Sequence, residues 1–476
     1  MKVAELKVRK GARKSSGRLW RWNGGAVLLG ALMMAWPAIY NGFPLLYPDS
    51  MTYLDDGRIV ARAVLLHQMS DYYGMRSFFY SLVILPLHWN VTLWPVVALQ
   101  CLLTAYVVWL VVKSFAPQRT ALNYLAVVAL LSLLTGMSWY STLIMPDFLG
   151  PVLYLSIYLL VFARERLTRG ERLSLYPIAG WAVVSHSTHL LLSAGLLLIL
   201  AAPLVVNRRD FRRRIRPIGE VAAMIALAVA AQLALNGYLY GRLSLDPARP
   251  PFLTARVIAD GPGRWYLEKH CAELKWVVCG HVHNLTDDVD NFLWAPDGIY
   301  QGSSDEDQRR MVREEMPFVL ATMRAYPLAQ IERSAANAWE QLQTFDFEDL
   351  DASSYVLDEF DPVMPQARAR YVKSRQARNQ LPLDLITSVQ NWTAAASLAV
   401  IGVFVPLLWR RHSGRVVGLG VVVVSMVLAN AAVTGAMSMV EGRFECRVIW
   451  LAPLLAGMCV LDWYAMSIAT EKGGTG

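Results

Sequence analysis

The chain has 476 residues, of which 55% are hydrophobic and only 17% are charged. The core of one soluble domain cannot use so much apolar surface, so the composition excludes an ordinary soluble protein and indicates an integral membrane protein. The net charge of +8 comes from 45 Lys and Arg against 37 Asp and Glu. Because the basic residues gather beside apolar runs, they indicate membrane topology, and we expect no nucleic acid partner.

Residues 1–22 hold eight Lys and Arg and are expected to form a basic cytoplasmic tail. The apolar run that follows is about twenty residues long, enough for a transmembrane helix, and it lacks a clear small-residue cleavage site. We therefore expect a retained helix and not a signal peptide.

Ten apolar stretches are expected to cross the bilayer, since its hydrocarbon core of roughly 30 Å needs about 20 helical residues. The fifth and sixth are short and read together as a hairpin, interrupted by the polar run 185–189. The predicted fold is an all-α polytopic membrane protein with an N-terminal module, 23–240, and C-terminal helices, 386–470. The spans cover about residues 24–44, 91–112, 121–139, 148–163, 174–187, 189–206, 217–240, 386–409, 416–440 and 448–469.

The distribution of Lys and Arg orients these helices, because basic short loops stay in the cytoplasm. Tails and loops on one side hold 24 basic residues, whereas the short loops on the other side hold five. Both termini, including the tail 471–476, are therefore predicted to be cytoplasmic. The predicted location is the bacterial inner membrane, with the first outer loop (41–76) and the loop 441–447 on the periplasmic face.

The first outer loop carries a candidate catalytic acid, Asp49. Pro48 fixes its own φ and restricts Tyr47, so Asp49 is held close to the membrane surface. Tyr47 and Tyr53 either stack on a sugar or fix the loop, and the sequence leaves both readings open.

Two short segments follow in the same loop. Residues 55–73 alternate apolar and charged side chains with the spacing of an amphipathic helix that lies in the membrane interface. Residues 77–88 are apolar but too short to span, so they lie at the interface or re-enter the membrane.

A second carboxylate, Asp147, follows Pro146 at the tip of a tight apolar hairpin on the same side. An acid inside an otherwise apolar bundle is functional by default. Asp147 either acts on substrate directly or pairs with an arginine of that face. His186 and His189 share one helical face at i and i+3, and they either touch substrate or are packed and hydrogen-bonded.

Residues 241–385 contain 16 basic and 23 acidic residues and are predicted to form one mainly helical periplasmic domain. Cys271 and Cys279 could pair as a disulfide in an oxidising compartment. As the alternative, both thiolates could bind a metal with the neighbouring histidines 270, 281 and 283, although the spacing matches no strong zinc signature.

The succession of these features resembles the GT-C class of membrane glycosyltransferases, relatives of the protein O-mannosyltransferases and of the lipid A aminoarabinose transferase. Those proteins have an acid in the first outer loop, an interfacial helix and a hairpin with an acid at its outer tip, as in residues 140–149 here. Their last outer loop places an Arg and an aromatic before a Pro-containing span, as Arg443-Phe444, Arg447 and Pro453 do here. The similarity covers about residues 24–240 and 386–469.

The resemblance implies transfer of a sugar from a polyprenyl-phosphate donor to a hydroxyl of an envelope glycan, lipid or protein acceptor. Asp49 would be the general base, and Asp147 would complete the catalytic pair. Preorganised cations would stabilise the departing phosphate, and arginine suits phosphate because its planar fork binds two oxygens. The expected substrate-binding residues are Arg443, Arg447, Arg76, His186, His189, Tyr47 and Tyr53.

The sequence leaves alternatives to these roles open. Each arginine could instead anchor the chain at lipid headgroups. The first loop of this family often carries two adjacent acids, whereas Asp49 is followed by Ser50 here. We therefore predict no metal ligands and assign no cofactor, and a bound divalent cation is the alternative. A lipid-linked oligosaccharide polymerase or ligase would use the same face. A lipid or glycan transporter would favour charges at the bilayer midplane and broken helices in matched halves, which the sequence lacks.

Overall fold

The structure is a computed structural model that describes residues 23–70, 76–206, 208–247, 249–410 and 414–473. The predicted tail 1–22 and the last three residues of the tail 471–476 lie outside these ranges. The chain is 80% helical, and the described residues contain no strand. The prediction of an all-α protein is confirmed.

Within the described residues, six helices are long and apolar enough to cross a membrane: Asn23–Asn41, Trp94–Phe115, Arg214–Tyr240, Leu383–Leu408, Gly414–Met437 and Gly442–Ser467. Each coincides with one of the ten predicted spans. The other four predicted spans fall on helices that are not among these six, so the polytopic helical architecture is observed while the number ten stays a prediction.

The N-terminal helices are α2 (Trp36–Asn41), α3 (Pro48–Leu66), α4 (Phe78–His88), α5 (Trp94–Phe115), α6 (Thr120–Leu134), α7 (Met137–Thr142), α8 (Leu149–Phe162), α9 (Arg169–Ser185), α10 (Ser187–Val206) and α11 (Arg208–Tyr240). The middle segment forms α12 (Phe252–Ala259), α13 (Pro262–His270), α14 (Val289–Trp294), α15 (Asp305–Ala325), α16 (Pro327–Gln343), α17 (Ser354–Asp358), α18 (Phe360–Val363) and α19 (Pro365–Tyr371). The C-terminal helices are α20 (Leu383–Arg410), α21 (Gly414–Met437), α22 (Gly442–Ile449) and α23 (Leu451–Gly473). Short 3₁₀ turns lie at Pro146–Phe148, Arg164–Arg166, Val277–Asn284, Glu348–Leu350 and Gln376–Arg378.

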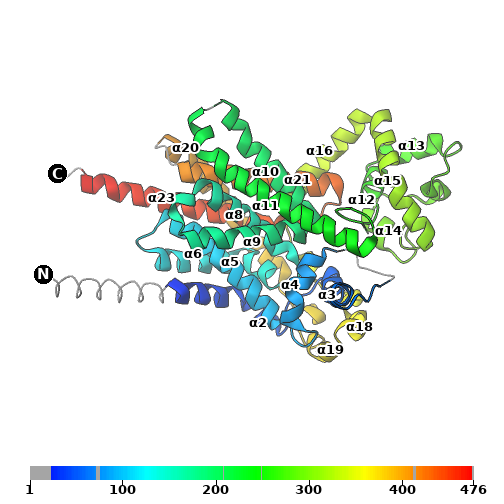
Figure 1. Ribbon diagram of the computed structural model, residues 1–476, viewed down its shortest axis with the longest axis horizontal. Helices are drawn as coiled ribbons and strands as arrows, with labels where there is room; N and C mark the ends of the chain where they lie inside the picture. Colours follow the sequence, from blue (N-terminus) through cyan, green and yellow to red (C-terminus); the bar gives the residue numbers. More distant parts are fainter. Residues whose placement is uncertain (1–22, 71–75, 207, 248, 411–413, 474–476) are drawn as a thin grey trace.

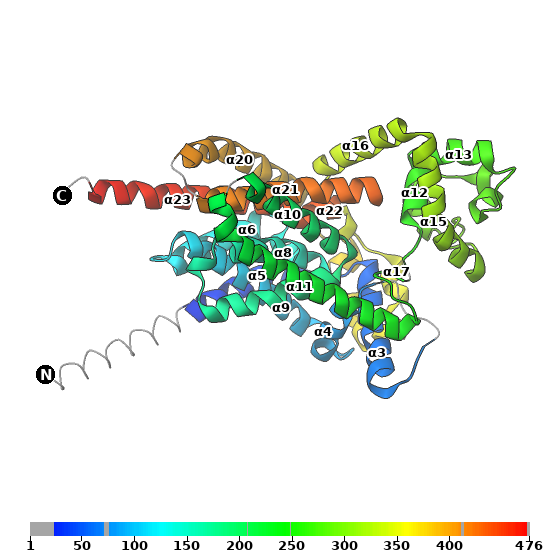
Figure 2. The same cartoon turned by 45° about the horizontal axis from the view of Figure 1, so that its top comes forward.

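The long helices lie side by side and give the bundle two ends (Figures 1 and 2). The first described helix starts, and α23 finishes, at the left of Figure 1, whereas α3 and α12 to α19 gather at the right. We call the right-hand end, which holds Asp49, the site end and the other the opposite end. An ion pair and a hydrogen bond join helix ends at the opposite end: Lys113 pairs with Glu171 at 2.6 Å, and Arg415 donates to the Ser114 carbonyl at 2.6 Å.

The first outer loop folds into α3 and α4. α3 starts at Pro48, a residue suited to the first helical position, and Ser50 Oγ accepts the Tyr47 N–H at 3.0 Å. The amphipathic helix therefore begins seven residues earlier than the predicted 55–73, and it ends at Leu66. α3 packs closely on α4, because Gly57 presents no side chain: a Cβ there would lie 2.6 Å from the Ser81 carbonyl oxygen.

The middle segment divides between two hydrophobic clusters. Apolar side chains of α12 to α15 form a cluster of their own, with Phe292, Phe318 and Leu267 almost fully buried. Residues after α16, such as Phe347 and Phe360, instead join the large cluster of the helix bundle. Part of the predicted 241–385 domain thus packs as an extension of the membrane module.

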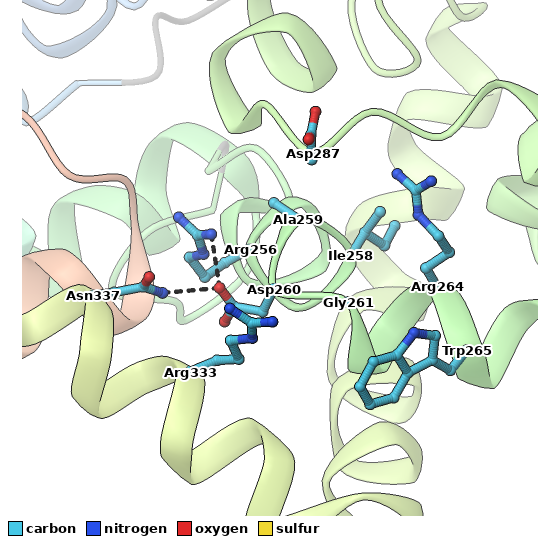
Figure 3. Close-up of a pocket in the computed structure, with 10 residues that line it drawn as sticks. All are labelled: Arg256, Ile258, Ala259, Asp260, Gly261, Arg264, Trp265, Asp287, Arg333 and Asn337. Atoms are coloured by element: carbon cyan, nitrogen blue, oxygen red, sulfur yellow. Dashed lines mark hydrogen bonds and ion pairs between the residues drawn. The ribbon is translucent and has the colours of Figure 1, made fainter.

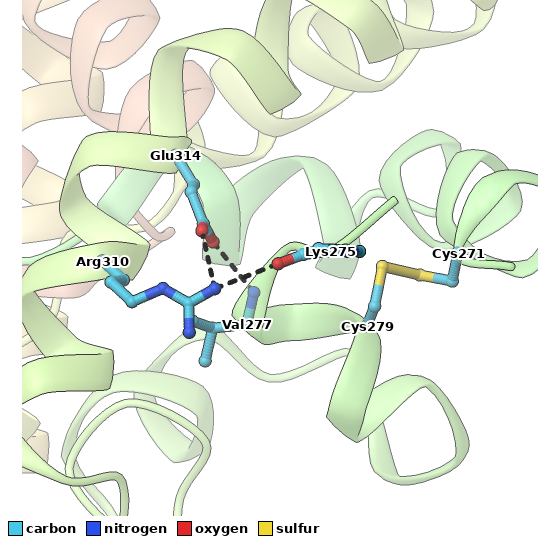
Figure 4. Close-up of a disulfide and its surroundings, with 6 residues drawn as sticks. All are labelled: Cys271, Lys275, Val277, Cys279, Arg310 and Glu314. Atoms are coloured by element: carbon cyan, nitrogen blue, oxygen red, sulfur yellow. Dashed lines mark hydrogen bonds and ion pairs between the residues drawn. A yellow bond between two sulfur atoms is a disulfide. The ribbon is translucent and has the colours of Figure 1, made fainter. Parts of the chain in front are cut away.

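Cys271 and Cys279 form a disulfide in the α12–α15 cluster (Figure 4). The loop between them is fixed to α15, since the Val277 N–H donates to Glu314 Oε2 at 2.9 Å and Arg310 donates to the Lys275 carbonyl at 3.0 Å. The predicted disulfide is confirmed. The metal reading that needed both thiolates is wrong, because a disulfide sulfur is no thiolate ligand.

Candidate functional site

Backbone pairing brings the two predicted acidic loops together. Leu45 and Leu143 form an isolated parallel bridge, in which the Leu45 N–H donates to the Thr142 carbonyl at 3.2 Å and the Ile144 N–H donates to the Leu45 carbonyl at 3.0 Å. This bridge holds the extended segment before α3 beside the hairpin tip that carries Asp147. The two acids therefore lie in one region, although about a hundred residues separate them.

A buried glutamine from the segment after α19 clamps the first loop from the other side. Gln376 Oε1 accepts the Leu46 N–H at 3.1 Å, and its Nε2 donates to the Leu46 carbonyl at 2.7 Å and to the Leu350 carbonyl at 3.2 Å. Both backbone groups of Leu46 are thus satisfied, as a buried peptide requires. The clamp links the middle segment directly to the loop that carries Asp49.

Asp49 lies between two arginines at the start of α3. Its Oδ1 accepts from Arg76 Nη2 at 2.5 Å, while its Oδ2 lies 3.9 Å from Arg443 Nη1. The Asp49 side chain is 17% exposed, so it is only partly buried. A helix N-terminus also favours a negative charge at this position.

Asp147 is more deeply buried and has a different partner. Its Oδ1 accepts from Arg447 Nη1 at 3.1 Å, and each of the two side chains is 1% exposed. Arg447 also donates to Asn430 Oδ1 at 3.1 Å, and Asn430 Nδ2 donates to Glu445 Oε2 at 2.9 Å. Asp147 Oδ2 is buried with no hydrogen-bond partner among the described residues.

The guanidinium of Arg443 donates fewer hydrogen bonds to the protein than those of Arg76 and Arg447 do. Its guanidinium lies over the Tyr47 ring at 4.0 Å and near the Phe444 ring at 5.0 Å. Its Nη1 lies 3.9 Å from Asp49 Oδ2, and its buried Nε has no hydrogen-bond partner within the described chain. Stacking holds the planar fork in place while leaving N–H groups for a ligand.

The two histidines stand where α9 meets α10. Their rings lie 5.3 Å apart, and His186 is within electrostatic reach of Arg447, Arg76 and Arg443. His189 Nδ1 bonds to the Ala182 carbonyl at 2.8 Å, so the backbone fixes its ring. His189 is therefore packed, as one of the two sequence readings has it, while its buried Nε2 has no described partner.

Tyr47 and Tyr53 are both occupied by other side chains of the protein. One face of Tyr47 carries Arg443, and Tyr53 packs edge-on against Tyr80 with ring centroids 5.0 Å apart. Tyr53 is 2% exposed. Tyr53 is thus packed within the protein, whereas Tyr47 is half-buried, and its role in sugar stacking stays a prediction.

Carboxylates of the middle segment and of the last outer loop border Arg443. Asp349 Oδ2 accepts the Arg443 backbone N–H at 3.0 Å. Burial, followed by the charge of Asp349, raises the pKa of Glu441 above its ordinary value. Burial, followed by the charges of Asp288 and Asp349, also raises the pKa of Asp290. This side of Arg443 therefore concentrates negative charge, part of which is relieved by protonation.

Sequence reasoning missed Asn430, Glu445 and the role of Asp349. Asn430 is fully buried in α21 and connects Arg447 with Glu445. The available signal was a lone amide in an apolar span, which normally has a specific partner. The contact of Asp349 with Arg443 could not be predicted, because it depends on how the middle segment returns to the bundle.

A separate polar pocket of about 370 Å³ lies in the middle segment (Figure 3). In this pocket, Asp260 pairs with Arg256 at 2.7 Å and accepts a hydrogen bond from Asn337 at 2.8 Å. The Asp260 carboxylate thus connects helix α12 with helix α16. None of the predicted site residues lines this pocket.

No group of three or more His, Cys, Asp or Glu among the described residues could hold a metal ion. The expectations about a cofactor or a divalent cation stay predictions.

The helical architecture and its candidate spans define a polytopic membrane protein with a buried cluster of charged residues at one end of the bundle. Comparison with protein families, with curated proteins and with solved structures found no match to this chain. The resemblance to the GT-C class therefore rests on the residues described above.

Proposed function

We propose that this protein is a membrane glycosyltransferase that moves a sugar from a polyprenyl-phosphate donor to an acceptor hydroxyl on the periplasmic face. The observation that supports the proposal best is the position of Asp49. One of its oxygens pairs with Arg76, and the other faces Arg443 across 3.9 Å in a partly accessible site. A transfer of this kind needs a carboxylate base and a phosphate-binding cation at one membrane surface.

The proposed reaction is a single displacement at the sugar carbon. The acceptor oxygen attacks this carbon and its proton passes to Asp49 Oδ2. The bond from the sugar carbon to the phosphate oxygen breaks, and the electron pair leaves with the polyprenyl phosphate. One displacement inverts the configuration at the carbon.

Arg443 is the proposed ligand of the leaving phosphate, because its donors are the least used and its fork is held by Tyr47. Positive charge that is already in place stabilises the negative charge that grows on the phosphate. Arg76 orients Asp49 through the 2.5 Å contact. Arg447, which is 1% exposed and bound to Asp147, is proposed to hold α22 and the hairpin tip in position.

Two observations support the proposed periplasmic orientation. Disulfides persist in oxidising compartments, and the Cys271–Cys279 disulfide belongs to the segment that the basic-residue count places outside. The site residues lie at the end of the bundle away from the described chain ends (Figure 1).

The test uses a strain that lacks the gene, complemented with the wild-type protein, Asp49→Asn or Asp55→Asn. Asp55 lies on the same helix and pairs with Arg58 at 2.6 Å, so its change is a matched control. Mass analysis of envelope glycans, lipids and proteins should show a sugar that is lost on deletion and restored by the wild type and Asp55→Asn only. Membrane insertion of all variants is checked by the amount of protein in the membrane fraction.

Restoration of the sugar by Asp49→Asn would contradict the proposed base. An unchanged set of envelope glycans in the deletion strain, with lipid or glycan transport by the reconstituted protein, would instead favour a transporter.

A further inference from the structure

A groove runs along the bundle between α9 and α11, and none of the predicted site residues lines it. Its volume is about 1020 Å³, at the upper end of the range for ligand sites. The wall is mainly apolar and includes Leu173, Trp181, Met224 and Leu227. Leu173 is 58% exposed and Leu227 is 73% exposed, so apolar surface is open along the groove.

The groove has a charged end, which is formed by arginines of the 3₁₀ turn Arg164–Arg166 and of the start of α9. Arg164, Arg169 and Arg172 line it together with one acid, Glu220. Arg164 pairs with Glu220 through contacts of 2.5 and 3.3 Å, which uses the negative charge. Arg172 has a buried Nε without a hydrogen-bond partner in the described structure, and Arg169 is exposed. Two positive charges therefore remain for a ligand.

The length of the groove matches one lipid chain. Arg172 and Val184 both line it and lie twelve residues apart on α9, which corresponds to about 18 Å at 1.5 Å per residue. One leaflet contributes about half of the roughly 30 Å hydrocarbon core. An acyl chain that starts at the arginines can thus lie along the whole apolar wall.

We propose that this groove binds one anionic glycerophospholipid, with its phosphate on Arg169 and Arg172 and one acyl chain along α9 and α11. The charge and the shape support the same occupant: basic side chains at a membrane surface attract anionic headgroups, and the apolar wall continues from that surface. The basic-residue count places this end at the cytoplasmic leaflet, where anionic lipids are attractive partners of arginine. The lipid site does not depend on the proposed transferase activity.

The experiment uses the full-length protein in detergent micelles, titrated with phosphatidylglycerol or phosphatidylcholine that carries a fluorescent acyl chain. Phosphatidylglycerol should bind more tightly. The double variant Arg169→Gln/Arg172→Gln should lower its affinity by about tenfold or more. The control variant Arg119→Gln/Arg166→Gln removes the same charge from exposed positions outside the groove and should leave the affinity unchanged.

A steric variant tests the apolar wall without changing charge. A Cβ at Gly180 would meet only Met224 Cγ, at 3.8 Å, so Gly180→Ala should be tolerated while Gly180→Leu fills the groove. Gly180→Leu should weaken binding of the lipid relative to Gly180→Ala. Excess inorganic phosphate should not displace the lipid, since it cannot cover the wall.

The proposal is overturned if the arginine double variant binds phosphatidylglycerol as tightly as the control variant does. It is also overturned if Gly180→Leu binds like Gly180→Ala, or if inorganic phosphate displaces the lipid.

Discussion

Both ends of the bundle pair basic residues with carboxylates, but they use the partners differently. At the opposite end, Lys113 Nζ contacts both oxygens of Glu171, at 2.6 and 2.8 Å. At the site end, Arg443 Nε and one oxygen of Asp147 are buried without a described partner. Buried polar groups are normally satisfied, because each unmade bond costs free energy. The Lys113–Glu171 pair therefore only joins the ends of α5 and α9, whereas the paired residues around Asp49 and Asp147 keep donors and acceptors that their own contacts do not use.

The largest expected effect comes from Arg447→Ala. The change leaves Asp147, which is 1% exposed, without its partner, and an unpaired buried charge typically costs about 3–5 kcal/mol. The unfolding temperature in detergent should drop strongly, and the yield of folded protein should fall.

The control for this change is the double variant Asp147→Asn/Arg447→Gln, which removes both charges. This variant should regain most of the stability that Arg447→Ala loses, because it leaves no unpaired buried charge. Wild-type stability of Arg447→Ala would show that the buried pair does not hold the site end together.

Arg443→Ala should act mainly on activity. If Arg443 binds the donor phosphate, the loss of a charged hydrogen bond of about 1.5–3 kcal/mol lowers kcat/KM by about tenfold to a hundredfold. Arg443→Lys should recover part of the loss, because lysine keeps the charge but not the planar fork. Kinetics with matched amounts of membrane-inserted protein measure both variants, with Arg58→Ala as the control on α3. Full activity of Arg443→Ala would place the phosphate elsewhere.

A smaller effect is expected in the pH dependence of stability. Glu441 keeps its proton to higher pH in the folded state than in the unfolded state, because burial and Asp349 raise its pKa. The folded protein therefore binds more protons, and stability falls as pH rises from the ordinary carboxyl range through the raised pKa. Above this range, Glu441→Gln should unfold at a higher temperature than the wild type.

Asp349, Arg443 and Asp290 are the charged groups that act on Glu441, so Asp290→Asn serves as a comparison that leaves the closest pair intact. Thermal unfolding measured from pH 4 to pH 9 should show the difference between Glu441→Gln and the wild type shrinking toward low pH. A constant difference over this range would contradict the assigned protonation.

The smallest effect is expected at the opposite end. Lys113→Gln breaks a pair whose side chains are 24% and 19% exposed, and partly solvated pairs contribute about 1 kcal/mol or less. Sugar transfer should be unchanged. If Lys113→Gln lost as much stability as Arg447→Ala, the distinction between the two ends would fail.

The helical architecture was accessible from sequence because it depends on long apolar runs, which the bilayer requires. Asp49 and Asp147 were accessible because each is a rare acid beside a proline in an apolar setting. The observed start of α3 at Pro48 was missed, since the amphipathic pattern becomes regular only after Asp55. The sequence also does not show that the middle segment is divided between two hydrophobic clusters. This division depends on the packing of Phe347 and Phe360 against helices that are distant in the sequence.

The sequence also does not show which arginine pairs with Asp49 and which pairs with Asp147. Arg76, Arg443 and Arg447 lie on the same predicted face, and nothing in their spacing tells which one pairs with which acid. Tertiary packing decides it: the buried α22 delivers Arg447 to Asp147 and leaves Arg443 nearer to Asp49.

Gly57 gives the contact between α3 and α4 an importance beyond packing. Asp49 lies about two helical turns before Gly57 on α3, and Arg76 stands just ahead of α4. A methyl group at residue 57 would collide with the Ser81 carbonyl and act as a wedge between the two helices. The alignment of a carboxylate and a guanidinium at 2.5 Å thus depends on a missing side chain that belongs to neither partner.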